Sequence, residues 1–234
     1  VQKEFAGEEY ELAHLHHKFQ SFAKPDATDD QKLAMLIKAA VELTTQEAPR
    51  WEIIAARLLM VQFDRALDER MTARHIETFT QKVAFLTEEG LYGDYILQHY
   101  TPAELSEAAS FLDPARNNLF TYAGLQLLLD RYVIRTHQGA PLESPQEMFL
   151  GIALHLAMEE DPAERLGWVR RFCDMLSTLK VTMATPTLSN ARKPFHQLSS
   201  CFIDTVPDSL DGIYRSIDNF AKESKYGGGM GLYF

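Results

Sequence analysis

A change in hydrophobic periodicity near residue 181 constrains the fold of this chain more than any other feature. Through residues 1–180, apolar side chains recur at helical spacing in one segment after another. Beyond that point the pattern becomes strand, helix, glycine-rich turn and strand, the order of a βαβ unit. Parallel strands need a sheet to join, and two strands do not complete one. We therefore predict a mainly α domain over 1–180 and the incomplete start of an α/β domain over 181–234.

Capping residues mark where several of the predicted helices begin. Residues 28–45 have an apolar face, and Thr28 and Gln31 have the spacing of a capping box. Residues 53–63 continue the helical pattern. An N-cap oxygen accepts a backbone N–H that the helix leaves unpaired, and proline has no N–H to leave unpaired. Three segments combine such an oxygen with proline at the first helical position and glutamate at the third: Thr101–Glu104, Ser144–Glu147 and Asp161–Glu164.

The last quarter of the chain carries the strand-like segments. Val181–Ala184 is β-prone and is interrupted by the Thr185-Pro186-Thr187 run, and residues 195–206 are a second strand-like stretch. Asp208, a candidate N-cap, is predicted to start a helix that ends at Lys225-Tyr226. One face of this helix is apolar, with Leu210, Ile213, Ile217 and Phe220 at helical spacing.

Composition excludes several classes of protein. The chain has 23 basic and 33 acidic residues, a net charge of −10, which argues against nonspecific binding to nucleic acid. It has no apolar run of about 18 residues, so we expect no membrane span. Val1-Gln2-Lys3-Glu4 does not begin a signal peptide, and two cysteines make no disulfide framework. We expect a cytoplasmic protein, and the missing initiator Met and the apolar final residues suggest that both ends are cut.

Clusters of titratable residues favour structural roles over chemistry. His14, His16 and His17 lack the converging partners that zinc requires, so we expect no metal site. Adjacent glutamate pairs such as Glu88-Glu89 point in different directions on a helix and fit a solvated surface.

The glycine run and the two cysteines are more informative. Residues 227–231 follow a helix, so they fit a C-cap and turn, although four glycines in five positions also fit close approach to a ligand. Cys173 lies on an amphipathic helical segment and is expected in the core. Cys201 follows Ser199 and Ser200 on a strand-like segment, where its thiol is either a simple buried group or a nucleophile or redox group.

Four ordered motifs, with similar helical stretches upstream, resemble the large subunit of class I ribonucleotide reductase over about residues 30–234. The motifs occur in the order and spacing of that family: Ala184-Thr185-Pro186-Thr187-Leu188-Ser189-Asn190, Gln197-Leu198-Ser199-Ser200-Cys201-Phe202, Asp208-Ser209-Leu210-Asp211-Gly212-Ile213-Tyr214, and Ser224-Lys225 with Gly228-Gly229-x-Gly231. The resemblance implies a helical domain followed by the first strand-helix-strand of a ten-stranded α/β barrel. It also implies reduction of ribonucleoside diphosphates to deoxyribonucleotides by thiyl-radical chemistry.

The resemblance assigns roles to eight residues. Thr185, Ser200, Cys201 and Gly229 match substrate-binding positions, and Cys201 also matches the first cysteine of the redox pair. The effector-binding positions are matched by Asp208, Ser209, Leu210 and Lys225, and the helix that starts near Asp208 matches the dimer interface of the family.

Further implications concern partners. The family uses deoxynucleotide and ATP effectors, a thioredoxin or glutaredoxin reductant, and a radical from a metal-containing small subunit. The glycine run also resembles cobalamin-dependent class II enzymes, so the radical source stays open. We expect no cofactor bound in this subunit, no complete ATP-binding cone, and no activity of this chain alone, because the radical cysteine and the second redox cysteine are missing. The alternative is a noncatalytic dimerisation or nucleotide-binding module in which Cys201 is inert.

Overall fold

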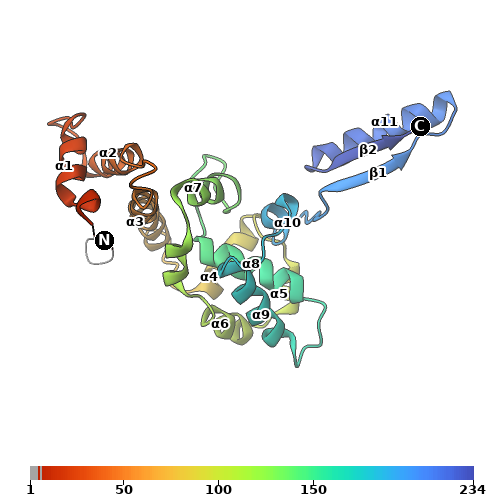
Figure 1. Ribbon diagram of the computed structural model, residues 1–234. Coiled ribbons are helices and arrows are strands. Elements are labelled where there is room, and N and C mark those ends of the chain that lie inside the picture. The colour runs from red at the N-terminus through yellow and green to blue at the C-terminus, as the bar shows by residue number, and fades with distance from the viewer. Residues whose placement is uncertain (1–4, 6) are drawn as a thin grey trace. The chain divides into compact units, whose positions relative to one another are not determined.

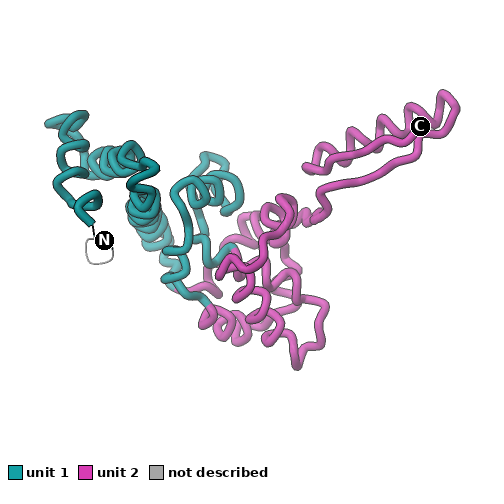
Figure 2. Tube along the Cα trace, in the orientation of Figure 1, with its two compact units in different colours: residues 1–77, 112–148 teal, residues 78–111, 149–234 magenta. Residues whose placement is uncertain are grey.

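The structure, a computed structural model, describes residue 5 and residues 7–234. The expectation made for residues 1–4 therefore lies outside the described residues. The chain divides into two compact units, one of residues 1–77 and 112–148 and the other of residues 78–111 and 149–234 (Figure 2). None of the helices within the described residues is long and apolar enough to cross a membrane.

The first unit is built from helices. In chain order they are the 3₁₀ helix η1 (Glu8–Tyr10), α1 (Leu12–Gln20), α2 (Asp29–Glu42), α3 (Trp51–Thr72), the 3₁₀ helix η2 (Pro114–Leu119), α7 (Tyr122–Arg131) and the start of α8 (Pro145–Ala157). Trp51 is buried among α1, α2 and α3, its ring lies 6.0 Å from that of Tyr10, and its Nε1 donates to the carbonyl of Glu9 at 2.9 Å. This indole therefore fixes the N-terminal segment to the helices through both packing and a hydrogen bond.

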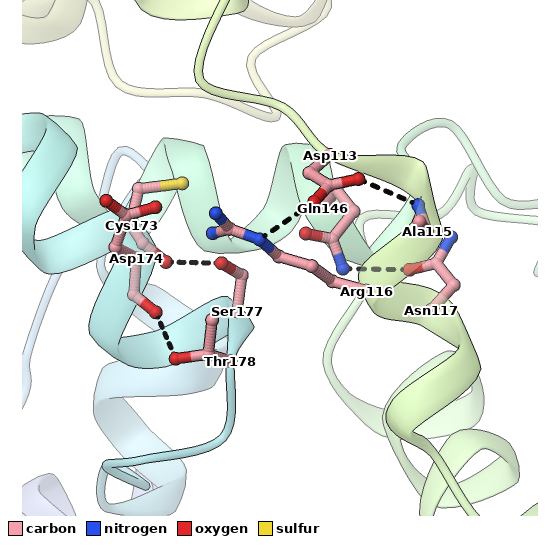
Figure 3. Close-up of polar contacts among 9 residues, drawn as sticks. All are labelled: Asp113, Ala115, Arg116, Asn117, Gln146, Cys173, Asp174, Ser177 and Thr178. Atoms are coloured by element: carbon pink, nitrogen blue, oxygen red, sulfur yellow. Dashed lines mark hydrogen bonds and ion pairs between the residues drawn. The ribbon is translucent and has the colours of Figure 1, made fainter.

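Side chains also order the start of η2, as Figure 3 shows. The Asp113 carboxylate accepts from the backbone N–H of Ala115 at 3.1 Å and from Arg116 Nε at 3.3 Å. The amide of Gln146 donates to Asn117 Oδ1 at 2.8 Å, which joins α8 to η2. The Asp113 side chain thus satisfies a backbone N–H that the first turn of η2 leaves unpaired.

The second unit contains the remaining elements. They are α4 (Phe79–Glu88), α5 (Tyr95–His99), α6 (Pro102–Ala109), the rest of α8, α9 (Arg165–Ser177), α10 (Thr185–Asn190), β1 (Cys201–Thr205), α11 (Leu210–Lys225) and β2 (Gly229–Tyr233). Helix α6 packs on α4 and α9, and its Leu105 is fully buried. The buried hydroxyl of Tyr100 donates to the carbonyl of Leu154 in α8 at 2.7 Å.

Most of the predicted helix starts are confirmed. Capping boxes are present at Thr28 and Thr101, and Ser144 and Glu147 exchange the same pair of bonds at the start of α8. The prediction for Asp161 is wrong by one turn, because α9 begins at Arg165. The Asp161 carboxylate accepts from the N–H two residues later, at Ala163, and this closes a turn instead of capping a helix.

Two strand predictions need correction. Residues 181–184 form no strand, and the Thr185-Pro186-Thr187 run that was expected to break one begins α10 instead. Proline is compatible with the first turn of a helix, and β-propensity alone makes no strand without a neighbour for its backbone. Residues 195–206 contain a strand only from Cys201 to Thr205, since the preceding segment is a loop beside α10.

The strand-helix-strand prediction is confirmed. Strands β1 and β2 are parallel, with Cys201 opposite Gly229 and Thr205 opposite Tyr233, and α11 connects them (Figure 1). Asn219 of α11 donates to the Asp204 carboxylate of β1 at 3.2 Å. The helix begins one residue later than predicted because Ser209, not Asp208, is the N-cap: its Oγ accepts from the N–H of Gly212 at 3.1 Å.

Helix α11 presents three different faces. Its small residues Gly212 and Ser216 are buried, and a Cβ on Gly212 would lie 2.6 Å from Pro207 in the turn before the helix. A second face is charged and carries Asp211, Arg215, Asp218 and Lys222. The third is the apolar face predicted from the sequence, and it is exposed: the exposed fractions are 71% for Leu210, 41% for Ile213, 51% for Ile217 and 43% for Phe220.

Candidate functional site

The start of β1 brings together three of the predicted site residues. Cys201 is the first residue of the strand and its thiol is exposed. Ser200 Oγ lies 3.5 Å from Cys201 Sγ, and the Ser200 carbonyl accepts from the N–H of Gly229 at 2.8 Å. An exposed thiol is accessible to a reaction partner, so the expectation of a merely buried Cys201 is wrong.

The glycine run has two structural explanations. Gly227 has φ +86°, the left-handed conformation that ends α11. A Cβ on Gly228 would lie 2.7 Å from the Phe202 ring, so this position needs glycine for packing. At Gly229 and Gly231 the nearest atoms would be backbone oxygens at 3.5 and 3.9 Å, an ordinary contact distance. Conformation and packing therefore account for the first two glycines, whereas the two in β2 leave open backbone opposite Cys201, at Gly229, and opposite Ile203, at Gly231.

Helix α10 is fastened to the segment that leads into this site. Thr187 Oγ1 donates to the carbonyl of Leu198 at 3.3 Å, and Asn190 Nδ2 donates to that of Gln197 at 3.0 Å. Thr185, the predicted substrate-binding residue, is the exposed first residue of this helix. The two bonds thus tie the helix that carries Thr185 to the residues just before Ser200.

The four predicted effector residues lie at the two ends of α11. Asp208, Ser209 and Leu210 are at its N-terminal end, whereas Lys225 is its last residue. At a rise of about 1.5 Å per residue, Leu210 and Lys225 are separated by about 22 Å along the helix. Asp208 and Lys225 of one chain are therefore too far apart to contact the same phosphate group.

Cys173 is a core residue, as predicted. Its exposed fraction is 1%, and it lies inside α9, where its carbonyl accepts from Ser177 Oγ at 2.6 Å (Figure 3). The next carbonyl, of Asp174, accepts from Thr178 Oγ1. Of the two cysteines in this chain, Cys173 is buried and Cys201 is exposed.

A tyrosine–histidine cluster that contacts the loop after α10 was not predicted from the sequence. The Tyr95 hydroxyl lies 3.2 and 3.1 Å from the carbonyls of Ala191 and Lys193, and 3.0 Å from Nδ1 of His155. The ring of His196 packs on both Tyr95 and His155, at centroid distances of 4.7 and 5.1 Å. No motif could have revealed this cluster, since its members are separated by 41 to 101 residues.

The protonation states of Tyr95 and His155 determine which group donates each hydrogen bond in the cluster. Burial, aided by the nearby His196, lowers the pKa of His155 from 6.5 to about 4, and burial also raises the pKa of the Tyr95 hydroxyl. Both groups are neutral at pH 7. When Tyr95 donates to the loop carbonyls, His155 Nδ1 must carry the proton and donate to the Tyr95 oxygen.

No metal centre is formed by the residues that the structure describes. Among them, no three His, Cys, Asp or Glu side chains are grouped so that they could hold an ion.

Comparisons with known proteins agree with the resemblance found in the sequence. The family model of the ribonucleotide reductase all-alpha domain matches residues 118–196, and that of the ribonucleotide reductase barrel domain matches residues 199–234. The strand-helix-strand unit thus lies within the barrel match. The predicted domain boundary after residue 180 stays a prediction.

Curated relatives match nearly the whole chain. It is 60% identical over all 234 residues to a protein of Treponema pallidum named ribonucleoside-diphosphate reductase subunit alpha, of which it covers 28%. Proteins of the same name from Helicobacter pylori and Synechocystis are 34% and 36% identical over 88% and 84% of the chain, which covers 25% of each. The chain therefore spans about a quarter of the length of these relatives.

Proposed function

Because the chain belongs to the ribonucleotide reductase large-subunit family, we propose that it forms part of the site at which the complete subunit reduces ribonucleoside diphosphates to deoxyribonucleoside diphosphates. One observation carries this proposal: the exposed Cys201 thiol stands beside the Ser200 hydroxyl and opposite the backbone of Gly229. Ser200, Gly229 and Thr185 bind the substrate in this proposal, and Cys201 supplies reducing electrons.

The reaction needs a pair of thiols. Two thiols become a disulfide and release two electrons and two protons; the 2′-hydroxyl leaves as water and a hydrogen takes its place. Cys173 cannot be the second thiol, because it is buried inside α9. The second thiol then comes from the part of the subunit outside this chain, and the 234-residue chain has no turnover by itself.

In this proposal the reaction also needs a radical source and a protein reductant. The relatives are each named as one subunit of a reductase, which favours a metal-containing small subunit over cobalamin as the source of the thiyl radical. No cofactor is held by this chain in the proposal. A thioredoxin or glutaredoxin reduces the disulfide after each turnover, in the cytoplasm.

Helix α11 serves dimerisation and effector binding in this proposal. Its exposed apolar face is the kind of surface that a partner covers. Leu210 is about 22 Å from Lys225 along one helix, and Asp208 and Ser209 precede Leu210 at the same end. When a second copy packs α11 against α11 in the antiparallel sense, the Lys225 end of one chain approaches the Asp208 end of the other. A deoxynucleotide or ATP effector would then contact both chains.

The test of the catalytic role compares the two cysteines in the complete enzyme. We expect Cys201→Ser to abolish multiple turnovers of CDP reduction with the radical source and thioredoxin present, because serine cannot be oxidised to a disulfide. Cys173→Ser is the matched control and should keep turnover per folded molecule. Effector binding and thermal unfolding show whether each variant is folded.

Unchanged turnover in Cys201→Ser would refute the proposed redox role. The chain would then be a noncatalytic dimerisation or nucleotide-binding module with an inert Cys201, for which the exposed face of α11 is the supporting observation.

A second experiment tests the dimer. Ile217→Glu places a charge on the apolar face of α11, whereas Arg215→Gln changes the net charge by the same one unit on its charged face. We expect Ile217→Glu to shift the complete subunit from dimer to monomer in light scattering, and Arg215→Gln to leave the dimer intact. A dimer that withstands Ile217→Glu would contradict this use of the helix.

A further inference from the structure

We propose that Asn190 is a positioning residue for the substrate site, because its side-chain amide fixes the residues before Ser200 and Cys201 relative to helix α10. This role rests on the proposed function, and it concerns a residue for which the family resemblance implies no role. Asn190 does not contact the substrate in this proposal. It acts through one hydrogen bond that closes the connection between α10 and β1.

The predicted substrate-binding residues of this part of the chain lie on two elements that are joined without regular structure. Thr185 is the first residue of α10, whereas Ser200 directly precedes β1. Residues 191–199 between them contain neither helix nor strand. Such a segment has no helix or sheet hydrogen bonds to hold its backbone, so the spacing between Thr185 and Ser200 depends on side chains that bond to it.

Asn190 makes the shorter of the two side-chain bonds that close this connection. Its Nδ2 donates to the carbonyl of Gln197 at 3.0 Å, within the usual range of about 2.7–3.2 Å for an N–H donor. Thr187 Oγ1 donates to the carbonyl of Leu198 at 3.3 Å, beyond the usual range of about 2.5–3.0 Å for a hydroxyl donor. The Asn190 amide therefore contributes more of the restraint than the Thr187 hydroxyl.

The backbone on the Asn190 side of this bond is held at successive residues. The carbonyl of Asn190 accepts from the N–H of Lys193 at 2.9 Å, and the carbonyl of Arg192 accepts from the N–H of Gly93 at 2.9 Å. The carbonyl of Lys193 lies 3.1 Å from the Tyr95 hydroxyl. A bond to the Asn190 amide therefore restrains Gln197 relative to the helices of this unit, and not only relative to its own loop.

The bond of Asn190 acts close to the proposed redox thiol. Two residues separate Gln197 from Ser200. The carbonyl of Ser200 accepts from the N–H of Gly229 at 2.8 Å, and its Oγ lies 3.5 Å from Cys201 Sγ. The segment just before the thiol is therefore fixed at both ends, by Asn190 at one end and by β2 at the other.

Loss of the amide should lower the population of the arrangement that binds substrate. A neutral hydrogen bond changes an equilibrium constant by about fivefold. The apparent dissociation constant of a ligand rises in inverse proportion to the population of the binding-competent arrangement. Bound substrate restores this arrangement, so we expect KM to rise while kcat stays unchanged.

Steady-state reduction of CDP by the complete enzyme, with its radical source and thioredoxin, tests this role. We expect Asn190→Ala to raise the KM for CDP about fivefold. Asn190→Asp keeps the size of the side chain but sets a charged acceptor against the Gln197 carbonyl, so KM should rise about tenfold. Asn117→Ala is the matched control, because it also loses one amide hydrogen bond, of 2.8 Å to Gln146, but in the first unit. This control should keep the wild-type KM.

A purely structural role of Asn190 would give a different pattern. A variant that only folds less completely lowers turnover per total protein and keeps the wild-type KM, and thermal unfolding shows the extent of folding. An unchanged KM in both Asn190 variants would overturn the inference. A wild-type KM in Asn190→Asp alone would also overturn it, since the volume of the side chain and not its N–H donor would then matter. Equal rises in Asn190→Ala and Asn117→Ala would show a general effect and have the same consequence.

The cysteine variant separates this role from the proposed function. If Cys201→Ser abolishes turnover while both Asn190 variants keep the wild-type KM, the positioning role is refuted and the proposed function stands. If Cys201→Ser keeps turnover, the proposed function is refuted and the positioning role falls with it.

Discussion

Removal of one hydroxyl group, in Tyr95→Phe, should destabilise the second unit by about 2 kcal/mol. That oxygen lies within 3.2 Å of three polar groups: the carbonyls of Ala191 and Lys193 and the Nδ1 of His155. A neutral hydrogen bond contributes about 1 kcal/mol net, and a buried partner left without a bond costs about 1–3 kcal/mol. Because the phenyl ring keeps its packing, the loss comes from the polar contacts alone.

Urea unfolding of the 234-residue chain measures this change. Tyr233→Phe is the matched control, because its side chain is 68% exposed in β2 and its hydroxyl should contribute less than about 0.5 kcal/mol. We expect the unfolding midpoint of Tyr95→Phe to fall with an unchanged m-value. Equal midpoints for the two variants would refute the argument that this hydroxyl holds the loop.

The pH dependence gives an independent check on the same cluster. Burial and His196 lower the folded-state pKa of His155 to about 4, whereas the unfolded chain has the ordinary value of 6.5. Between these values the unfolded state binds more protons, so stability must fall as the pH falls from 6.5 to 4. The full shift corresponds to about 3 kcal/mol. His155→Gln should remove most of this dependence, and a wild-type slope that persists in the variant would assign it to other groups.

Three further predictions concern other parts of the chain. Burial, with Asp68 and Glu147 nearby, raises the pKa of Asp64 to about 6. The folded state therefore binds more protons than the unfolded state between pH 4 and 6, and the protein loses stability as the pH rises through this range. In urea titrations, Asp64→Asn should increase the free energy of unfolding by about 1–2 kcal/mol at pH 7.5 and leave it unchanged at pH 3.5. Gly227→Ala should lower the free energy of unfolding by about 1–2 kcal/mol, because Gly227 has φ +86°. Gly167→Ala, in α9 with open space around it, should raise the free energy of unfolding by about 0.5–1 kcal/mol. A change of the same sign in both variants would contradict the conformational argument. One thiol, Cys201, should react with Ellman's reagent in the folded chain, and Cys201→Ser should abolish that fast phase; a fast phase that survives would mean that Cys173 is accessible.

The candidate site was predictable in part because its chemistry is concentrated in short segments. The motif around Ser200 and Cys201 indicated the thiol, and the glycine run indicated a turn into a strand that the structure pairs with Cys201. The role of Tyr95 could not be predicted, because its hydroxyl contacts the carbonyls of Ala191 and Lys193, which lie 96 and 98 residues away in the chain.

The features that the sequence determined by itself depend on interactions between residues no more than four positions apart. The caps at Thr28, Thr101 and Ser144, and the turn at Gly227, each depend on a side chain or a φ angle that acts on its immediate neighbours. The apolar face of α11 is likewise visible in its spacing. Such features are read from a short window, because their energies involve no distant part of the chain.

Tertiary structure decided everything that needs a distant partner. Residues 181–184 have strand propensity but no strand, since a strand exists only where another backbone accepts its hydrogen bonds. Helix α11 turned the face of Gly212, Ser216 and Asn219 inward, with Asn219 bonded to Asp204 of β1, and this left its apolar face exposed. Tyr95, His155 and Lys193 became neighbours only when three separate segments packed, since a hydrogen bond of 3 Å depends on the fold and not on sequence separation.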